Sequence, residues 1–126
     1  MRRWLSFALP LLAAAACSGP SPVSVPKGEW GGRNMNLFVD DAGASASFKC
    51  GAQGRINQPL VVNDTGSFDL TGTYDPVLIN GGARPARYTG TLSGTTLRLT
   101  VSLDGGSVGT YEVDEGKPAS FDVCNY

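Results

Sequence analysis

Three cysteines and the complete absence of histidine limit the chemistry that this sequence can do. Without histidine, the usual general base and every Ser-His or Cys-His nucleophile arrangement are excluded. Cys17, Cys50 and Cys124 are far apart in the sequence, so they lack the close spacing of a redox pair. Two or three cysteines without histidine also do not make the usual metal site. We therefore expect no enzyme activity, no bound metal and no cofactor.

Carboxylates are the remaining groups that could catalyse a reaction or bind a cation. The aspartates that fall in predicted hairpin turns are Asp40, Asp41, Asp64 and Asp104. Aspartate is favoured in such turns because it hydrogen-bonds the local backbone. Calcium binding by Asp40-Asp41 or Asp114-Glu115 is the alternative, although neither pair has the spacing of a calcium loop. Asp69 and Asp122 alternate with apolar neighbours, and we expect both to face solvent.

Residues 1–16 have the anatomy of a secretory signal peptide. Arg2 and Arg3 precede an uncharged run of 13 residues, from Trp4 to Ala16, that ends in Ala14-Ala15-Ala16 before Cys17. A helix that spans a bilayer needs about 20 apolar residues, and Pro10 would break one kept as an anchor. The pattern therefore predicts that this segment is removed on export.

Cys17 follows small residues and precedes Ser18 and Gly19, which resembles the lipobox of bacterial lipoproteins. The resemblance covers about the first 19 residues and departs from the usual pattern at Ala14, where leucine is most often found. It implies that Cys17 becomes the mature N-terminus and carries acyl chains that anchor it stably in a membrane. Ser18, in place of aspartate, resembles an outer-membrane sorting signal, which implies a location in the cell envelope, facing the periplasm. Plain cleavage after Ala16 is the alternative.

An exported chain that uses Cys17 for lipid retains two cysteines, Cys50 and Cys124. In an oxidising compartment, the default state of two such thiols is a disulfide. The bond would attach the C-terminal segment to the end of an early strand.

The mature chain has the size of a single domain. Removing residues 1–16 from the 126 leaves 110, with 8 basic and 11 acidic residues and a formal charge of −3. The absence of a basic stripe argues against nucleic-acid binding. Three prolines in residues 17–27 predict an extended tether, about 30 Å long, ahead of one β domain in residues 28–126.

Glycine and proline interrupt the domain so often that its longest unbroken segments are ten residues, which is too short for a stable isolated helix. In the segment 95–104, four apolar residues alternate with polar ones, as in a half-buried strand. Similar but weaker alternation recurs at 37–39, 46–50, 68–74, 88–92, 108–113 and 121–123. We therefore expect an all-β fold, a small antiparallel β-barrel of seven to nine short strands, with a β-sandwich as the alternative.

Particular residues favour the barrel. Gly72 and Gly90 fall on inward-facing strand positions, where glycine marks a sharp bend or a close backbone approach. Trp30, next to Gly31-Gly32, is expected to plug one end of the barrel, with an exposed recognition residue as the alternative.

The longest connection, from Asp75 to Arg87, is the first candidate for binding a partner, because binding residues tend to lie on long loops of a rigid scaffold. The candidate partner-binding residues are Arg84, Arg87, Tyr74 and Tyr88. Arginine and aromatic residues are enriched in interface hot spots. A surface loop without a binding role is the alternative.

Taken together, these features predict a non-catalytic binding or structural module of the cell envelope, attached to a membrane through lipid on Cys17 and bound to an envelope protein. The first alternative is an inhibitor of a hydrolase, which resembles in size and export route the small periplasmic barrel inhibitors of lysozyme or metalloproteases. None of those families' inhibitory motifs is present. The second alternative is a carrier of a small apolar ligand inside the barrel.

Overall fold

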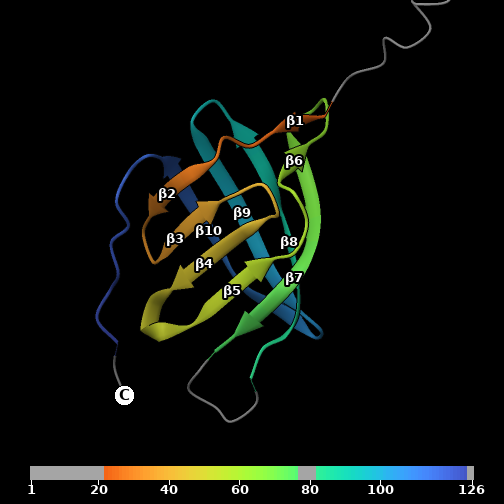
Figure 1. Ribbon diagram of the computed structural model, residues 1–126. Coiled ribbons are helices and arrows are strands. Elements are labelled where there is room, and N and C mark those ends of the chain that lie inside the picture. Colours follow the sequence, from red (N-terminus) through yellow and green to blue (C-terminus); the bar gives the residue numbers. More distant parts are fainter. Residues whose placement is uncertain (1–21, 77–81, 125–126) are drawn as a thin grey trace, which may run out of the picture.

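The computed structural model describes residues 22–76 and 82–124 (Figure 1). The predicted signal peptide and Cys17 lie outside the described residues. Within them the strands are β1 (Val23–Ser24), β2 (Gly28–Gly32), β3 (Met35–Val39), β4 (Ala44–Phe48), β5 (Gln53–Ile56), β6 (Val61–Val62), β7 (Ser67–Asp75), β8 (Arg84–Ser93), β9 (Thr96–Leu103) and β10 (Gly106–Glu115). A 3₁₀ turn, η2 (Lys49–Gly51), joins β4 to β5. No helix in the described ranges is long and apolar enough to cross a bilayer.

Eight of these strands form a closed antiparallel barrel in the order β10-β2-β3-β4-β5-β7-β8-β9. The prediction of an all-β barrel is therefore confirmed, and the sandwich alternative is wrong. Within the barrel, consecutive strands pair directly from β2 to β5 and from β7 to β10. β5 pairs with β7 because β6 lies outside the barrel and pairs with β1. Pairing of β10 with β2 closes the barrel, so each of the eight strands has a neighbour on both sides.

The barrel interior is filled by side chains at alternate strand positions. Leu97, Leu99 and Val101 of β9 are fully buried, which confirms the period-two pattern of the sequence. Trp30 is 0% exposed, and its Nε1 donates a hydrogen bond of 2.9 Å to the carbonyl oxygen of Pro26. Trp30 is therefore a core residue, and the alternative of an exposed recognition residue is wrong.

Two glycines allow neighbouring strands to approach closely, as the sequence predicts. A Cβ at Gly72 would lie 1.9 Å from the carbonyl oxygen of Arg55, and one at Gly90 would lie 2.1 Å from that of Arg98. A side chain at either position would collide with the main chain of the paired strand, so the curvature of the barrel requires glycine there.

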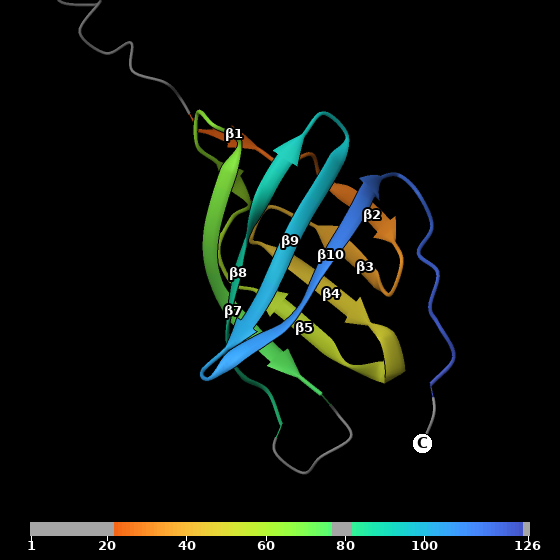
Figure 2. The same cartoon turned by 180° about the vertical axis from the view of Figure 1, so that it is seen from behind.

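The barrel has two different ends, which Figures 1 and 2 show from opposite sides. At the proximal end, the chain enters through β1, which pairs with β6 beside the turn 40–43. At the distal end lie η2, the end of β7 and the start of β8. The polypeptide leading from residue 1 therefore joins the barrel at the end opposite to η2.

The domain begins earlier in the sequence than predicted. Val23 and Ser24, expected to belong to the tether, pair with β6, and the buried Val25 donates a main-chain hydrogen bond of 2.8 Å to Leu60. Sequence reasoning placed no strand here because three prolines in this region favour an extended tether.

A second correction concerns residues 121–123, which alternate like a strand but do not join the barrel. Beyond β10, within the described residues, the chain makes one isolated parallel bridge, between Ser120 and Arg33. Phe121 and Val123, expected to face the core, are exposed.

Candidate functional site

Both ends of the segment expected to be one long loop belong to strands. β7 extends to Asp75 and β8 begins at Arg84, so Arg84 and Arg87 lie on a strand rather than in a loop. Of the connection between these strands, residues 77–81 lie outside the described residues. Arg84 is exposed at the distal end.

Arg87 has a partner within the barrel wall. Its Nε donates a hydrogen bond of 2.6 Å to Asp69 Oδ1 on β7, and its Nη2 donates to Oδ2. Asp69 faces solvent, as predicted, and its bonds to Arg87 lower the pKa of this carboxyl from its ordinary value. An arginine engaged by a carboxylate in this way is less available to a partner than Arg84.

The two predicted tyrosines belong to the inside of the barrel. Tyr88 is 0% exposed, and its hydroxyl donates a hydrogen bond of 2.6 Å to the carbonyl oxygen of Thr73. Burial raises the pKa of Tyr88. It also raises the pKa of Tyr74, which is less deeply buried. Tyr74 packs edge-on against Phe48, as does Tyr111, with ring centroids 5.2 Å apart in both pairs. Tyr88 is therefore not available at the surface, and the other aromatic rings close the distal end.

The predicted disulfide is present. Cys50 and Cys124 are bonded, with Cα atoms 5.6 Å apart, and they are 74 positions apart in the sequence. Cys50 has φ of 66°, a left-handed conformation that non-glycine residues adopt infrequently. The bond fixes residues 117–124, which we call the C-terminal arm, to η2 at the distal end.

The arm is also held against the turn between β2 and β3. Ser120 donates a main-chain hydrogen bond of 3.0 Å to Gly32 and accepts one of 2.6 Å from Asn34. Asp122 donates its N–H to Asn34 Oδ1 at 2.8 Å, and its carboxylate accepts hydrogen bonds from Arg33 and Asn34. These bonds lower the pKa of Asp122 from its ordinary value. Asp122 is partly exposed to solvent, as predicted, and these bonds in addition attach its side chain to the turn between β2 and β3.

The arm places its apolar side chains outward. Phe121 is 48% exposed and Val123 is 83% exposed. Phe121 lines a cleft of about 370 Å³ together with Phe48, Ala52 and the disulfide. Neighbouring exposed apolar side chains beside an apolar cleft are typical of an interaction site. Sequence reasoning missed this surface, although Pro118, which interrupts strand pairing, is a signal that β10 does not continue into it.

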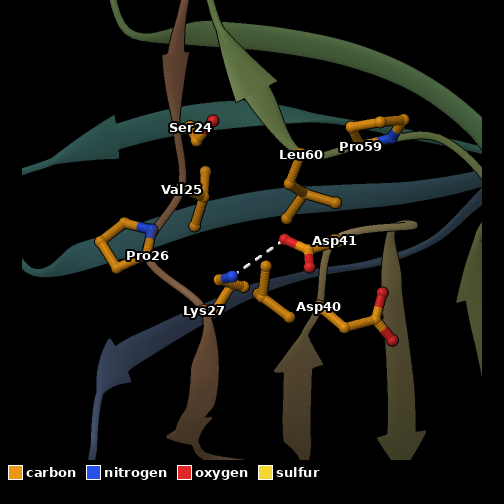
Figure 3. Close-up of a pocket in the computed structure, with 9 residues that line it drawn as sticks. Ser24, Val25, Pro26, Lys27, Asp40, Asp41, Pro59 and Leu60 are labelled. Atoms are coloured by element: carbon orange, nitrogen blue, oxygen red, sulfur yellow. Dashed lines mark ion pairs between the residues drawn. The ribbon is translucent and has the colours of Figure 1, made fainter.

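A second cleft, of about 300 Å³, lies at the proximal end (Figure 3). Val25, Pro26, Pro59 and Leu60 line it, and an ion pair of 2.9 Å between Lys27 and Asp41 spans it. Both partners of this pair are largely exposed, which limits its strength.

The aspartates near this cleft serve the turn that they occupy. Asp40 Oδ1 accepts hydrogen bonds of 2.9 Å from the main-chain N–H groups of Ala42 and Gly43, as predicted for a turn aspartate. Among the described residues, no three His, Cys, Asp or Glu side chains are grouped so that they could hold a metal ion.

The distal end therefore carries the features that suit binding: the exposed cation of Arg84, the exposed side chains of Phe121 and Val123, and the cleft beside them. The proximal end carries the segment that leads to residue 1. No family model matches the sequence, and neither a curated protein nor a solved structure matches it significantly.

Proposed function

We propose that this chain is a lipid-anchored, non-catalytic module of the cell envelope that binds an envelope protein through the distal end of its barrel. The supporting observation is the opposition of the two ends. The chain enters the barrel through β1 at the proximal end, whereas the disulfide-held arm presents Phe121 and Val123 at the distal end.

The length of chain ahead of β1 strengthens this orientation. Cys17 and Val23 are six residues apart, and an extended chain spans at most about 3.6 Å per residue, or roughly 20 Å in all. Lipid on Cys17 would therefore keep the proximal end close to the outer membrane. The distal end would then face the periplasm, where a partner can reach it.

The non-catalytic character rests on the sequence and on the roles of the carboxylates. The chain has no histidine, Asp40 closes its own turn, and Asp69 and Asp122 are engaged by arginines. Each of these carboxylates has a structural role that accounts for it without catalysis.

Carriage of an apolar ligand inside the barrel has less support. Trp30, Met35 and Tyr88 are 0% exposed and belong to one core cluster, so a ligand would have to displace large packed side chains.

A second candidate function is inhibition of a hydrolase that binds to the distal end. The disulfide and the Arg33–Asp122 ion pair hold the arm in one conformation, and preorganised segments lose less entropy on binding. The test is residual activity of a panel of lysozymes and secreted proteases incubated with micromolar purified chain. Full activity of every enzyme in the panel discards this candidate.

Site-specific photo-cross-linking in the source organism tests the main proposal. A photo-reactive amino acid replaces Phe121 in one variant and Phe38 in a matched control, because Phe38 on β3 is 51% exposed and Phe121 is 48% exposed. We expect a discrete cross-linked protein from position 121 and none from position 38. Cys17→Ala should release the chain from the membrane fraction and reduce the cross-link. Equal cross-linking from both positions, or none from position 121, contradicts the proposal.

A further inference from the structure

We propose that the C-terminal arm binds an extended peptide segment of the partner protein, which adds to the main chain of Phe121 and Val123 as a β-strand. The segment has apolar side chains at alternate positions and an acidic residue between them. This inference rests on the function proposed above and names the chemistry of the partner at the same site.

The hydrogen bonds of the arm alternate along the chain. Ser120 and Asp122 direct main-chain groups to the turn between β2 and β3. Successive residues of an extended segment direct their main-chain groups to opposite sides. The intervening residues, Phe121 and Val123, make no main-chain hydrogen bond to any residue that the structure describes. The arm thus has one edge bound to the barrel and one open edge.

An open edge of this kind is a template for another strand. Closure of the barrel gives each of its eight strands a neighbour on both sides, although β2 pairs only with Val113–Glu115 of the longer β10. The arm lies outside that closed sheet, and Ser120 connects it to β2 and β3 through a single bridge.

The arm is fixed before a partner binds. The disulfide of Cys124, the ion pair of Asp122 with Arg33 and the main-chain bonds of Ser120 hold it at three successive alternate residues. Because the arm is already held, pairing with a second strand orders mainly the incoming peptide, which lowers the entropic cost of binding.

Side chains define what the added strand contains. Phe121 borders the cleft of about 370 Å³ that Phe48, Ala52 and the disulfide also line. A cleft of this size accepts one large aliphatic or aromatic side chain. In strand addition, the main chain contributes affinity, and pockets for alternate side chains contribute specificity, which is why we assign apolar residues to alternate positions.

Charge defines the remaining position. Asp122 carries one negative charge, but Arg33 donates hydrogen bonds to it and Lys49 lies close enough to lower its pKa further. Arg33 and Lys49 thus place two positive charges near the carboxylate of Asp122, and Glu112, which lines the same pocket as Arg33 and Asp122, is itself paired with Arg98. An acidic residue between the apolar ones in the bound segment complements these positive charges.

Selection of octapeptides from a random displayed library on the exported, disulfide-bonded chain tests the inference without knowledge of the natural partner. We expect enriched peptides with apolar residues at alternate positions and an acidic residue between them. A synthetic copy of an enriched peptide, N-methylated at alternate amides along one edge, should lose at least tenfold in affinity. The copy methylated along its other edge should bind as the parent does. Equal affinity of the two methylated copies overturns strand pairing.

Variants of the arm provide the matching test on the protein. Val123→Pro removes an outward N–H that has no partner in the described structure, whereas Val123→Thr keeps it. We expect Val123→Pro to weaken the selected peptide about tenfold at an unchanged melting temperature and with no free thiol, and Val123→Thr to retain binding. Phe121→Thr should weaken binding, whereas the matched Phe38→Thr should not.

Other outcomes separate this inference from the proposed function. If Val123→Pro leaves peptide affinity unchanged while the cross-link from position 121 persists, strand addition is overturned and distal-end binding stands. If the wild-type chain is a dimer in sedimentation and Val123→Pro makes it a monomer, the occupant is a second copy, and the peptide proposal is overturned. If position 121 gives no cross-link in cells while the purified chain still binds the selected peptide, the proposal of an envelope protein partner is contradicted instead.

Discussion

Arg33 donates a hydrogen bond of 3.2 Å from Nε to Oδ2 of Asp122, and its Nη2 donates one of 3.0 Å to the same oxygen. The two residues are 89 positions apart in sequence, so this pair attaches the end of the chain to the first turn of the barrel. Its dependence on the charge of Asp122 makes the arm sensitive to acid.

The first prediction concerns pH. Bonds from Arg33 and Asn34 depress the pKa of Asp122 below its ordinary value of 3.8. A carboxyl whose pKa is lower in the folded state stabilises the fold at pH values above its ordinary pKa. This stability is lost as the pH falls through the pKa of the folded state. An NMR titration should therefore give Asp122 a midpoint below 3.8. Asp122→Asn should lower the melting temperature above about pH 5, and the difference from wild type should narrow in acid.

Asp69 provides the control for this titration, because Arg87 depresses its pKa in the same direction. Asp69→Asn should therefore leave the midpoint of Asp122 unchanged. A midpoint for Asp122 at or above its ordinary value would contradict the pairing with Arg33.

The second prediction concerns the buried hydroxyl of Tyr88. Tyr88→Phe leaves the carbonyl oxygen of Thr73 without this hydrogen bond and should lower the free energy of unfolding by about 1–2 kcal/mol. In the described structure, the hydroxyls of Tyr74 and Tyr111 make no hydrogen bond, so Tyr74→Phe and Tyr111→Phe should change it by less than about 0.5 kcal/mol. Urea unfolding of the three variants measures this contrast. Equal effects would argue against a specific role for the Tyr88 hydroxyl.

The third prediction concerns alkaline pH. Burial raises the pKa of Tyr88 from the ordinary 10.0, so its neutral form is favoured in the folded barrel. A group whose pKa is higher in the folded state stabilises the fold at pH values below its ordinary pKa. This stability is lost as the pH rises toward the pKa of the folded state. Ultraviolet titration should show one tyrosine that ionises only as the barrel unfolds, and Tyr88→Phe should abolish that phase. A phase that survives in Tyr88→Phe would assign it to another tyrosine.

The fourth prediction concerns the glycines of the barrel wall. Gly72→Ala would place a Cβ 1.9 Å from a main-chain oxygen, which cannot move without separating β5 from β7. We expect a loss of about 3 kcal/mol or more in the free energy of unfolding. At Gly109 the nearest atoms belong to the mobile end of the Tyr111 side chain, 3.0 Å away, so Gly109→Ala should cost much less. Similar midpoints of unfolding for the two variants would contradict this explanation of barrel curvature.

The fifth prediction concerns the disulfide. In the chain-entropy model, removal of a cross-link that closes a loop of this length costs about 4.5 kcal/mol of stability. The variant Cys50→Ala/Cys124→Ala should lose this amount and also keep a residue with positive φ at position 50. Cys50→Gly/Cys124→Ala should be more stable than the alanine pair by about 1 kcal/mol, because glycine adopts positive φ without strain. Equal stability of the two double variants would show that position 50 relaxes once the bond is removed.

The sequence predicts the barrel well because its signals are local. Alternation in the segment 95–104 requires one buried face, and the turn residues supply the conformations that hairpins need. β2 and β5 were missed as strands because Gly31, Gly32 and Gly54 replace the apolar residues that would mark a buried face.

The candidate site could be predicted only in part, because it depends on contacts between distant residues. The disulfide followed from the number of cysteines and the expected compartment, without geometry. Phe121 and Val123 alternate as a core strand does, yet Asp122 is drawn to Arg33 and Asn34, which turns the segment over. The apolar residues of this alternating segment therefore face outward instead of toward the core. The long-range ion pair between Arg33 and Asp122 decides between these two orientations.

The pairing of β1 with β6 has a mechanical consequence for a chain held by its beginning. A pull on the residues before Val23 reaches this ribbon first, and the ribbon consists of only two residues in each strand. This ribbon should detach at low force, which would lengthen the tether by a few residues. Trp30, packed inside the barrel, would then resist further extension. The barrel could thus move away from its attachment point under load and return without unfolding.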